Sequence, residues 1–162
     1  MKKRWIFTFL VTAAVGTALH FVYDLCPVPL VGVFAPVNES VWEHLKLLFW
    51  PMLAAGFFLA GESQGSRRFW GAWLLGVLLA PAFLLGVFYA LLAGFGVESM
   101  AVDIALYYLS LAVGFWAAWH TKDSEAAEKL AGVLVIAAGV YGAALVLFTA
   151  APPDLPIFGS KV

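Results

Sequence analysis

Long apolar stretches alternate with short polar connections along the whole chain. A helix needs about 20 apolar residues to cross the roughly 30 Å of hydrocarbon in a lipid bilayer, so the longer stretches qualify as membrane spans. They cover approximately residues 5–23, 40–61, 69–95, 99–119 and 129–150. The pattern predicts an all-α protein, an integral membrane bundle of five transmembrane helices that forms a single domain over residues 1–162.

Composition supports this class and excludes others. Hydrophobic residues make up 64% of the chain and charged residues 12%, whereas a soluble domain carries about a quarter charged residues and under half apolar ones. These values exclude a disordered chain, an ordinary soluble enzyme and, with a net charge of −1, a nucleic-acid partner. The single cysteine, Cys26, excludes an intramolecular disulfide and a cysteine-built metal cluster.

The basic residues predict the direction of the spans. Lys161 alone would follow the last span, and Lys46 falls inside the second. The other seven lie before the first span or in the connections on the same side: Lys2, Lys3, Arg4, Arg67, Arg68, Lys122 and Lys129. Cytoplasmic loops are enriched in Lys and Arg, so we expect a cytoplasmic N-terminus and an outside C-terminus in a cytoplasmic (inner) membrane. Membrane lipid is the expected partner, and a homodimer is compatible with so short a chain.

The connection between the first two spans is unlike the others. Residues 24–39 contain Pro27, Pro29 and Pro36 and are otherwise largely apolar. Three prolines oppose a regular helix, so we expect the segment to lie against the outer interface or to dip back into the membrane. We interpret it as a lid.

A stripe of small and polar residues follows the first predicted helix. Thr8, Thr12 and Gly16 are spaced by four and share a face with His20. Small residues allow close helix approach, so this face should point into the bundle.

Ionisable residues are concentrated at one depth. The first span ends, and the second and fourth begin, on the outer side, so their polar ends should meet there. Burying a charge in a bilayer costs at least about 2.5 kcal/mol, which makes such residues functional candidates. The ionisable candidates are His20, Asp24, Glu39, Glu43, His44, Lys46, Tyr89, Asp103 and Tyr107, and the polar residues Asn38 and Ser40 lie beside them in the sequence.

One hypothesis is a site for Zn²⁺ or another divalent metal. His20, His44 and Asp103, with Asp24 as a further ligand, offer imidazole and carboxylate groups. Three protein ligands and one open position describe catalytic zinc. Glu43 and His44 are adjacent and project about 100° apart on a helix, so both would reach one ion only at the edge of the interior face.

A metal there predicts a hydrolase acting on a lipid-like or small substrate. Glu43 or Glu39 would serve as ligand or general base. Lys46 and Asn38 would orient the substrate or stabilise negative charge. Ser40, Tyr89 and Tyr107 would complete the pocket.

Other interpretations use the same residues. Acid and histidine chains relay protons or bind ions in transporters. A non-catalytic binder of lipid or of a partner protein would need the cluster only as structural support. Ser40 and Glu43 match a capping box, Lys46 could pair with Glu43 three residues earlier, and a His20–Asp103 hydrogen bond could lock the bundle.

The run Pro36–Leu47, read as PVNESVWEHLKL, resembles the signature of a family of small bacterial multi-span membrane proteins of unknown function. His20, late in the first span, Pro51 and the proline-rich ending 152–156 are similar to that family's other features. The resemblance implies a membrane location and no known reaction. It points to His20, Asn38, Glu39, Glu43, His44 and Lys46.

Overall fold

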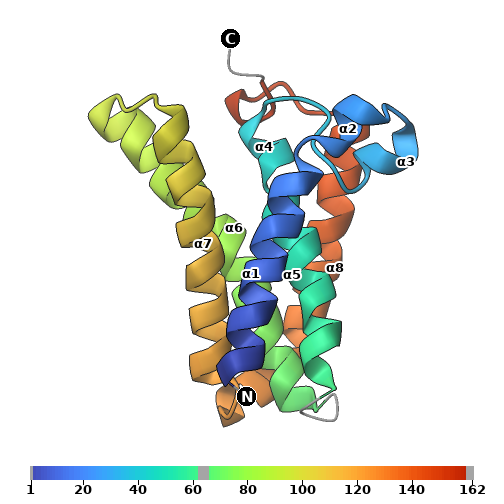
Figure 1. Ribbon diagram of the computed structural model, residues 1–162, viewed down its shortest axis with the longest axis vertical. Coiled ribbons are helices and arrows are strands. Elements are labelled where there is room, and N and C mark those ends of the chain that lie inside the picture. Colours follow the sequence, from blue (N-terminus) through green and yellow to red (C-terminus); the bar gives the residue numbers. More distant parts are fainter. Residues whose placement is uncertain (1, 62–65, 160–162) are drawn as a thin grey trace.

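The computed structural model describes residues 2–61 and 66–159, and within these ranges the protein is all-helical (Figure 1). The helices are α1 (Lys2–Leu19), α2 (Val22–Leu25), α3 (Pro29–Gly32), α4 (Val41–His44), α5 (Lys46–Ala60), α6 (Arg67–Phe95), α7 (Met100–Thr121), α8 (Glu125–Ala150) and the 3₁₀ helix η1 (Pro156–Phe158). The predicted all-α class is confirmed for these residues.

Three helices, α6, α7 and α8, are long and apolar enough to cross a membrane, which indicates a membrane protein. The other two predicted spans differ from expectation. The first is helical only to Leu19 and opens with three basic residues. The second is divided at Leu45 into the short helix α4 and the 15-residue helix α5. Hydropathy does not reveal such an interruption, because it reports transfer to lipid and not helix continuity.

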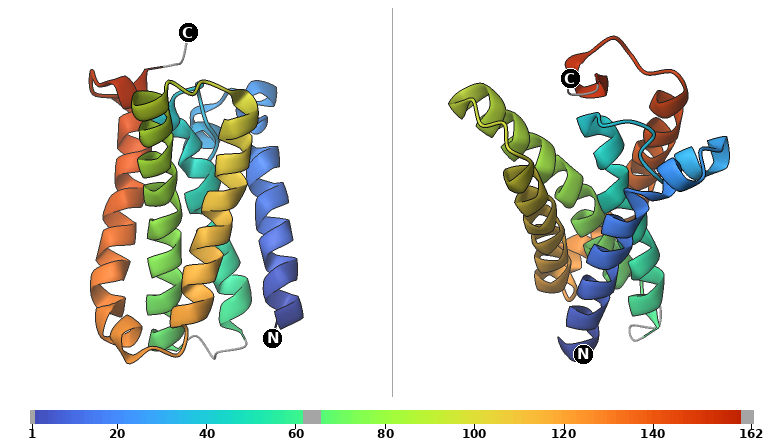
Figure 2. Two further views of the ribbon diagram at one scale, coloured as in Figure 1. Left: turned by 90° about the vertical axis from the view of Figure 1, so that its left-hand side faces the viewer. Right: turned by 45° about the horizontal axis from the view of Figure 1, so that its top comes forward.

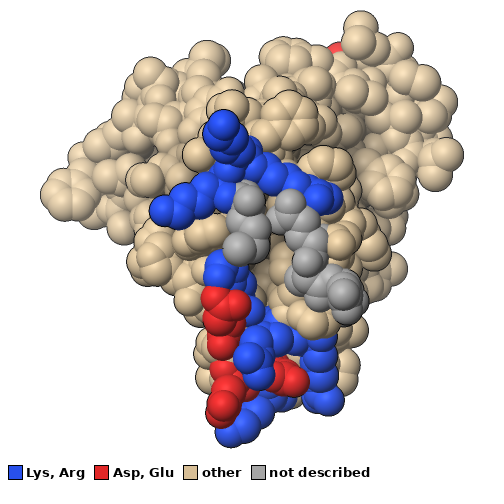
Figure 3. Space-filling view, turned by 60° about the horizontal axis from the view of Figure 1, so that its bottom comes forward, with Lys and Arg blue, Asp and Glu red and all other residues tan. Residues whose placement is uncertain are grey.

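The charged residues separate the molecule into two ends. Helices α1, α6 and α8 begin, and α5 and α7 finish, at the end drawn at the bottom of Figure 1. Figure 3 views the molecule with this end brought forward and shows Lys and Arg side chains gathered there, with Asp and Glu among them on one side. We call it the basic end. The opposite end, which holds α4 and the candidate site, is the cluster end.

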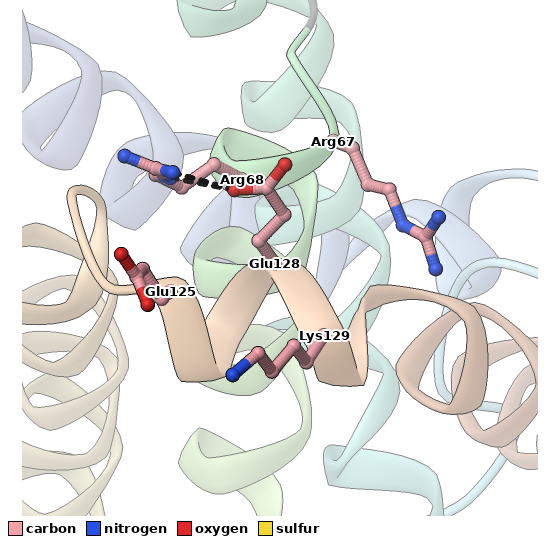
Figure 4. Close-up of a pocket in the computed structure, with 5 residues that line it drawn as sticks. All are labelled: Arg67, Arg68, Glu125, Glu128 and Lys129. Atoms are coloured by element: carbon pink, nitrogen blue, oxygen red, sulfur yellow. Dashed lines mark hydrogen bonds and ion pairs between the residues drawn. The ribbon is translucent and has the colours of Figure 1, made fainter.

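Polar contacts hold the helices together at the basic end. Arg68 of α6 donates to Glu128 of α8 at 2.6 Å and 2.9 Å, through Nη2 and Nε (Figure 4). Arg67, Glu125 and Lys129 line the same shallow cavity of about 490 Å³. The cavity has both charge signs on its wall, and the pair of Arg68 and Glu128 ties α6 to α8.

Backbone contacts fix α6 between α7 and α8. A Cβ atom added to Gly76 would lie 2.3 Å from the carbonyl oxygen of Gly114 on α7, and one added to Gly71 would lie 2.0 Å from that of Ala127 on α8. Glycine at these positions is required for the close approach. Further along α6, a Cβ at Gly86 would meet nothing within 4 Å. The later part of α6 and the start of α7 therefore lean away from the other helices (Figure 2, right).

The small and polar face of α1 points into the bundle, as predicted. Thr8, Thr12 and Gly16 are buried. The two threonine hydroxyls donate to the carbonyl oxygens four residues earlier in the same helix, at 2.8 Å and 2.7 Å. Gly16 contacts α7 and α5, because a Cβ there would lie 2.1 Å from the hydroxyl of Tyr107 and 2.6 Å from the carbonyl oxygen of Leu47.

The predicted lid, residues 24–39, lies at the cluster end of the molecule (Figure 1). With α2 and α3 it packs beside α4 and α5, on the side away from α6 and α7 (Figures 1 and 2). The Phe34 ring lies 5.3 Å from that of Trp50 on α5, at a T-shaped angle. Much of the segment remains exposed, with Leu30 73% exposed, and Glu39 is its one residue in the described lining of the cleft.

Candidate metal site at the cluster end

The start of α4 is fixed by short-range hydrogen bonds. The Asn38 side-chain oxygen accepts from the backbone N–H of Ser40 at 2.9 Å, and the Ser40 hydroxyl accepts from the N–H of Glu43 at 3.3 Å. Ser40 is thus the N-cap that the sequence pattern predicts. With this turn held rigid, the adjacent side chains of Glu43 and His44 point to different surroundings.

Glu43 points into the protein and forms a buried ion pair with Lys46. The Lys46 ammonium lies 2.6 Å from Oε2 of Glu43, and the side chains are 0% and 2% exposed. The same ammonium donates to the backbone oxygens of Gly32 at 2.7 Å and Ala35 at 3.5 Å. This pairing of Lys46 with a carboxylate three residues earlier is one of the structural interpretations that the sequence offers.

The carboxylate of Glu43 is also fully engaged. Its Oε2 accepts from the backbone N–H of Val37 at 3.0 Å, and its Oε1 accepts from the Thr149 hydroxyl of α8 at 2.7 Å. Ion pairs that bury both charges are stable only when the remaining donors and acceptors are satisfied. This pair therefore joins the 24–39 segment, α4, α5 and α8, and it leaves no polar atom to face a substrate.

His44 points the other way, toward α1. Its Nε2 lies 3.5 Å from Oε2 of Glu39, and Nε2 of His20 lies 3.9 Å from Oε1 of the same carboxylate. The two imidazole rings are 5.1 Å apart. One ligand atom from each of the three residues lies within 4.8 Å of the others, so they form a group that could hold a metal ion. We call His20, Glu39 and His44 the open cluster.

Hydrogen bonding prepares the open cluster for a cation. Nδ1 of His44 lies 2.8 Å from the backbone oxygen of Ser40. A carbonyl oxygen only accepts, so Nδ1 donates to it and Nε2 is the nitrogen that faces Glu39. Nδ1 of His20 is buried without a hydrogen-bond partner among the described residues. The two histidines are 28% and 30% exposed and Glu39 is 68% exposed, so the cluster is reachable from solution.

A cleft of about 790 Å³ extends from the open cluster between α1, α4 and α5 on one side and α6 and α7 on the other. The helices on its two sides diverge toward the cluster end, and their ribbons form the V-shaped arrangement in Figure 1. Its lining residues are Thr17, His20, Phe21, Glu39, Val41, His44, Leu47, Leu84, Phe88, Glu98, Ser99, Met100, Asp103, Ile104, Leu106, Tyr107 and Tyr108.

The remaining predicted residues have different positions. Asp103 and Tyr107 line the cleft from α7, and the Tyr107 hydroxyl donates to the carbonyl oxygen of Ala13 at 3.4 Å. Asp24 is exposed on α2 and lies outside the described lining of the cleft. Tyr89 packs against the core and is likewise outside that lining. Asn38 and Ser40 serve the start of α4.

Sequence reasoning missed several cleft residues, among them Thr17, Glu98 and Tyr108. Thr17 of α1 and Tyr108 of α7 form a hydrogen bond of 3.1 Å that joins the two helices beside the cleft. Glu98 lies in the short turn between α6 and α7 and adds a carboxylate to the wall. It is the one acidic residue in that turn, a signal that could have pointed to it.

Together, the fold and this site define a helical membrane protein with a partly exposed histidine and glutamate cluster beside a cleft. The chain belongs to a family of unknown function, DUF6512, whose sequence profile matches residues 1–162. Neither the curated proteins nor the solved structures gave a match to the chain.

Proposed function

We propose that this membrane protein binds a divalent transition metal, most simply Zn²⁺, at His20, Glu39 and His44, and that it hydrolyses a substrate held in the adjacent cleft. The observation that carries the proposal is the convergence of two imidazoles and one carboxylate, from the end of α1 and from the start of α4, within 4.8 Å. Two histidines and one carboxylate are a donor set that zinc and non-haem iron accept.

The spacing of the donor atoms fits one ion. Zinc ligands at 2.0–2.2 Å in a tetrahedral arrangement lie about 3.4 Å from one another. The two histidine-to-glutamate distances, to different oxygens of one carboxylate, are 3.5 Å and 3.9 Å, and the three ligand atoms lie within 4.8 Å of one another. Rotation of these side chains would bring the atoms to the spacing that one ion requires. The hydrogen bond from His44 to Ser40, which orients the His44 ring, supports it further.

Each residue then has a role that its position supports. His20, Glu39 and His44 would hold the ion, which would supply Lewis acidity and activate water. Asp103, on the opposite wall of the cleft, would accept a proton as general base; this assignment replaces the ligand role expected from the sequence. Glu43 and Lys46, the other predicted catalytic residues, would instead position His44 by holding α4 against its surroundings.

We place the protein in a cytoplasmic (inner) membrane with five spans. Helix α1 and the α4–α5 pair would cross beside α6, α7 and α8, and the basic end would face the cytoplasm. The open cluster and the cleft would then belong to the outer leaflet.

Transport through the bundle is the weaker alternative. A proton or ion path needs polar groups beyond the cleft, but the buried hydroxyls of Thr8, Thr12 and Ser110 donate to their own helices. Tyr107 packs against Gly16 directly below the cluster. The described residues thus offer a pocket that is polar at one end and not a continuous path.

Zinc titration of the purified protein tests the metal site. We expect one Zn²⁺ per chain after dialysis, measured by elemental analysis, with an affinity that falls as pH is lowered because protons compete for the ligands. His20→Ala and His44→Ala should each weaken binding at least about 100-fold. The matched control is His120→Ala, since His120 is exposed at the basic end. Equal loss in all three variants, or no stoichiometric metal in the wild type, would refute the proposal.

The hydrolase role has a separate test. Asp103→Asn should retain zinc and lose turnover of a chromogenic ester or amide with an acyl chain. Retained turnover in this variant would remove Asp103 as the base, and absence of turnover in zinc-loaded wild type on a panel of such substrates would leave only a metal-binding role.

A further inference from the structure

The cleft beside the open cluster is divided into a polar and an apolar part. Its volume of about 790 Å³ lies in the range of small-molecule sites. Asp103 and Tyr107 are separated by one helical turn of α7, about 6 Å, so the wall changes from carboxylate to aromatic ring toward the middle of the bundle. Deeper residues are hydrophobic: Leu47, Leu84, Phe88 and Leu106. This division suits a molecule with a polar head and an apolar chain.

The charge on the cleft wall has one sign. Glu39, Glu98 and Asp103 contribute three carboxylates, and no lysine or arginine is among the described lining residues. Lys46, the basic residue nearest in sequence to the open cluster, is 0% exposed and paired with Glu43. Even with a divalent ion in the open cluster, these three carboxylates exceed its charge. An anionic headgroup would find no cationic side chain here, whereas a cation would be attracted.

Aromatic rings are the second feature that favours a cation. Phe21, Phe88, Tyr107 and Tyr108 line the cleft together with the carboxylates. Ring faces attract ammonium groups, and rings combined with carboxylates are a common way to bind quaternary ammonium ligands. Both features arise from the residues of the wall and not from the metal.

We propose that the cleft selects a single-chain amphiphile whose headgroup carries an ammonium group. The head would lie among Glu98, Asp103 and the aromatic rings, and the chain would extend along Leu84 and Leu106. That the bound amphiphile is also hydrolysed rests on the proposed function, because the open cluster lies where the headgroup would be.

Photolabelling with matched probes tests this selection. The probes are dodecyltrimethylammonium and dodecyl sulfate, each with a diazirine near the chain end, added to the full chain in a neutral maltoside detergent. Mass spectrometry would report labelling at residues 84–88 relative to the exposed apolar face of α8 at Val133 and Ile136, which corrects for non-specific partitioning. We expect this ratio to be at least about fivefold higher for the ammonium probe.

Variants separate charge selection from other effects. Glu98→Gln combined with Asp103→Asn should bring the two probes to nearly equal ratios. Asp154→Asn is the matched control, since Asp154 is an exposed acid that is outside the described lining of the cleft, and it should keep the preference. A preference for dodecyl sulfate, equal ratios in the wild type, or an unchanged preference in the double variant would overturn the inference.

The same labelling, done with a chelator and with zinc, distinguishes the two proposals. Zinc binding without ammonium preference refutes the inference and leaves the metal site. Ammonium preference in a protein that binds no zinc refutes the metal site and supports the inference.

Discussion

Glu43 and His44 are neighbours in the sequence, yet they belong to two polar groups with opposite properties. The buried ion pair of Glu43 and Lys46 is excluded from solvent and uses every donor and acceptor it has. The open cluster of His20, Glu39 and His44 is partly exposed and has a nitrogen without a partner. One group is complete without a ligand and the other is incomplete.

The difference shows that a charge buried in a membrane protein is not by itself evidence of catalysis. Both groups are conspicuous in an apolar sequence, but only satisfaction of their hydrogen bonds distinguishes them. The complete pair stabilises the position of α4. The incomplete cluster, held by that helix, is the part available to a ligand.

The largest expected effect comes from breaking the complete pair. Lys46→Met would leave the Glu43 carboxylate buried without its cation and should lower the free energy of unfolding by about 3–5 kcal/mol. Thermal unfolding in detergent measures it. Lys129→Met, at an exposed position of the basic end, should change stability by less than about 0.5 kcal/mol. Equal melting temperatures for Lys46→Met and Lys129→Met would show that the buried ion pair does not stabilise the protein. Glu43→Leu combined with Lys46→Met should recover much of the lost stability, because no unpaired charge remains.

The open cluster should affect stability only when metal is present. At a free zinc concentration 100 times the dissociation constant, binding should stabilise the wild type by about 2.7 kcal/mol. His44→Ala should abolish this increment and, with a chelator present, should differ little from the wild type. Melting curves with zinc and with chelator measure both quantities. A large destabilisation of His44→Ala under chelation would mean that the cluster is structural, like the buried pair.

Thr149 tests whether α8 belongs to the buried pair. Thr149→Val removes the donor to Oε1 of Glu43 and should destabilise the protein by about 1.5–3 kcal/mol, the range for a hydrogen bond to a charged group. Zinc affinity should be unchanged, since Thr149 is not part of the open cluster. Chemical denaturation with a parallel zinc titration provides the measurement, and a loss of zinc binding would contradict the separation of the two groups.

Ser40 should show the smallest effect, because its two ends serve different groups. Ser40→Ala removes the hydroxyl cap of α4 and should cost about 1 kcal/mol. The backbone oxygen that orients His44 remains, so zinc affinity should fall by less than a factor of ten. Thermal melting and zinc titration of this one variant compare the two roles directly. A fall in affinity of 100-fold or more would show that the cap controls the cluster.

Much of the architecture could be predicted from the sequence, because burial in lipid requires long apolar runs. All five predicted stretches contain helix, and the stripe of Thr8, Thr12 and Gly16 faces inward as expected. The break at Leu45 and the end of α1 at Leu19 could not be predicted, since hydropathy reports transfer to lipid and not the continuity of a helix. The sequence also could not show which helices residues 24–39 lie beside, because an apolar proline-rich segment can pack on protein or on lipid.

The sequence predicted which residues gather near the candidate site, but not how they divide into a buried ion pair and an open cluster. The sequence indicated which ionisable residues gather at one end, and His20, Glu39 and His44 do meet there. It could not show that Glu43 points away from this group and contacts Lys46 and Thr149 instead, since the direction of a side chain depends on tertiary contacts. Helical geometry gave the best indication that Glu43 and His44 point to different surroundings, because adjacent residues project about 100° apart on a helix.

The contact between Gly76 and Gly114 has a mechanical consequence for the distance between the cleft walls. From Gly114 to Asp103 the axis of α7 measures about 16 Å, so a tilt of about 5° about that contact would shift Asp103 by about 1.4 Å. A shift of that size decides whether a carboxylate reaches a reacting group. The hydrogen bond between Thr17 and Tyr108 opposes such a tilt. The glycine contact and this hydrogen bond therefore set the distance between the two walls of the cleft together.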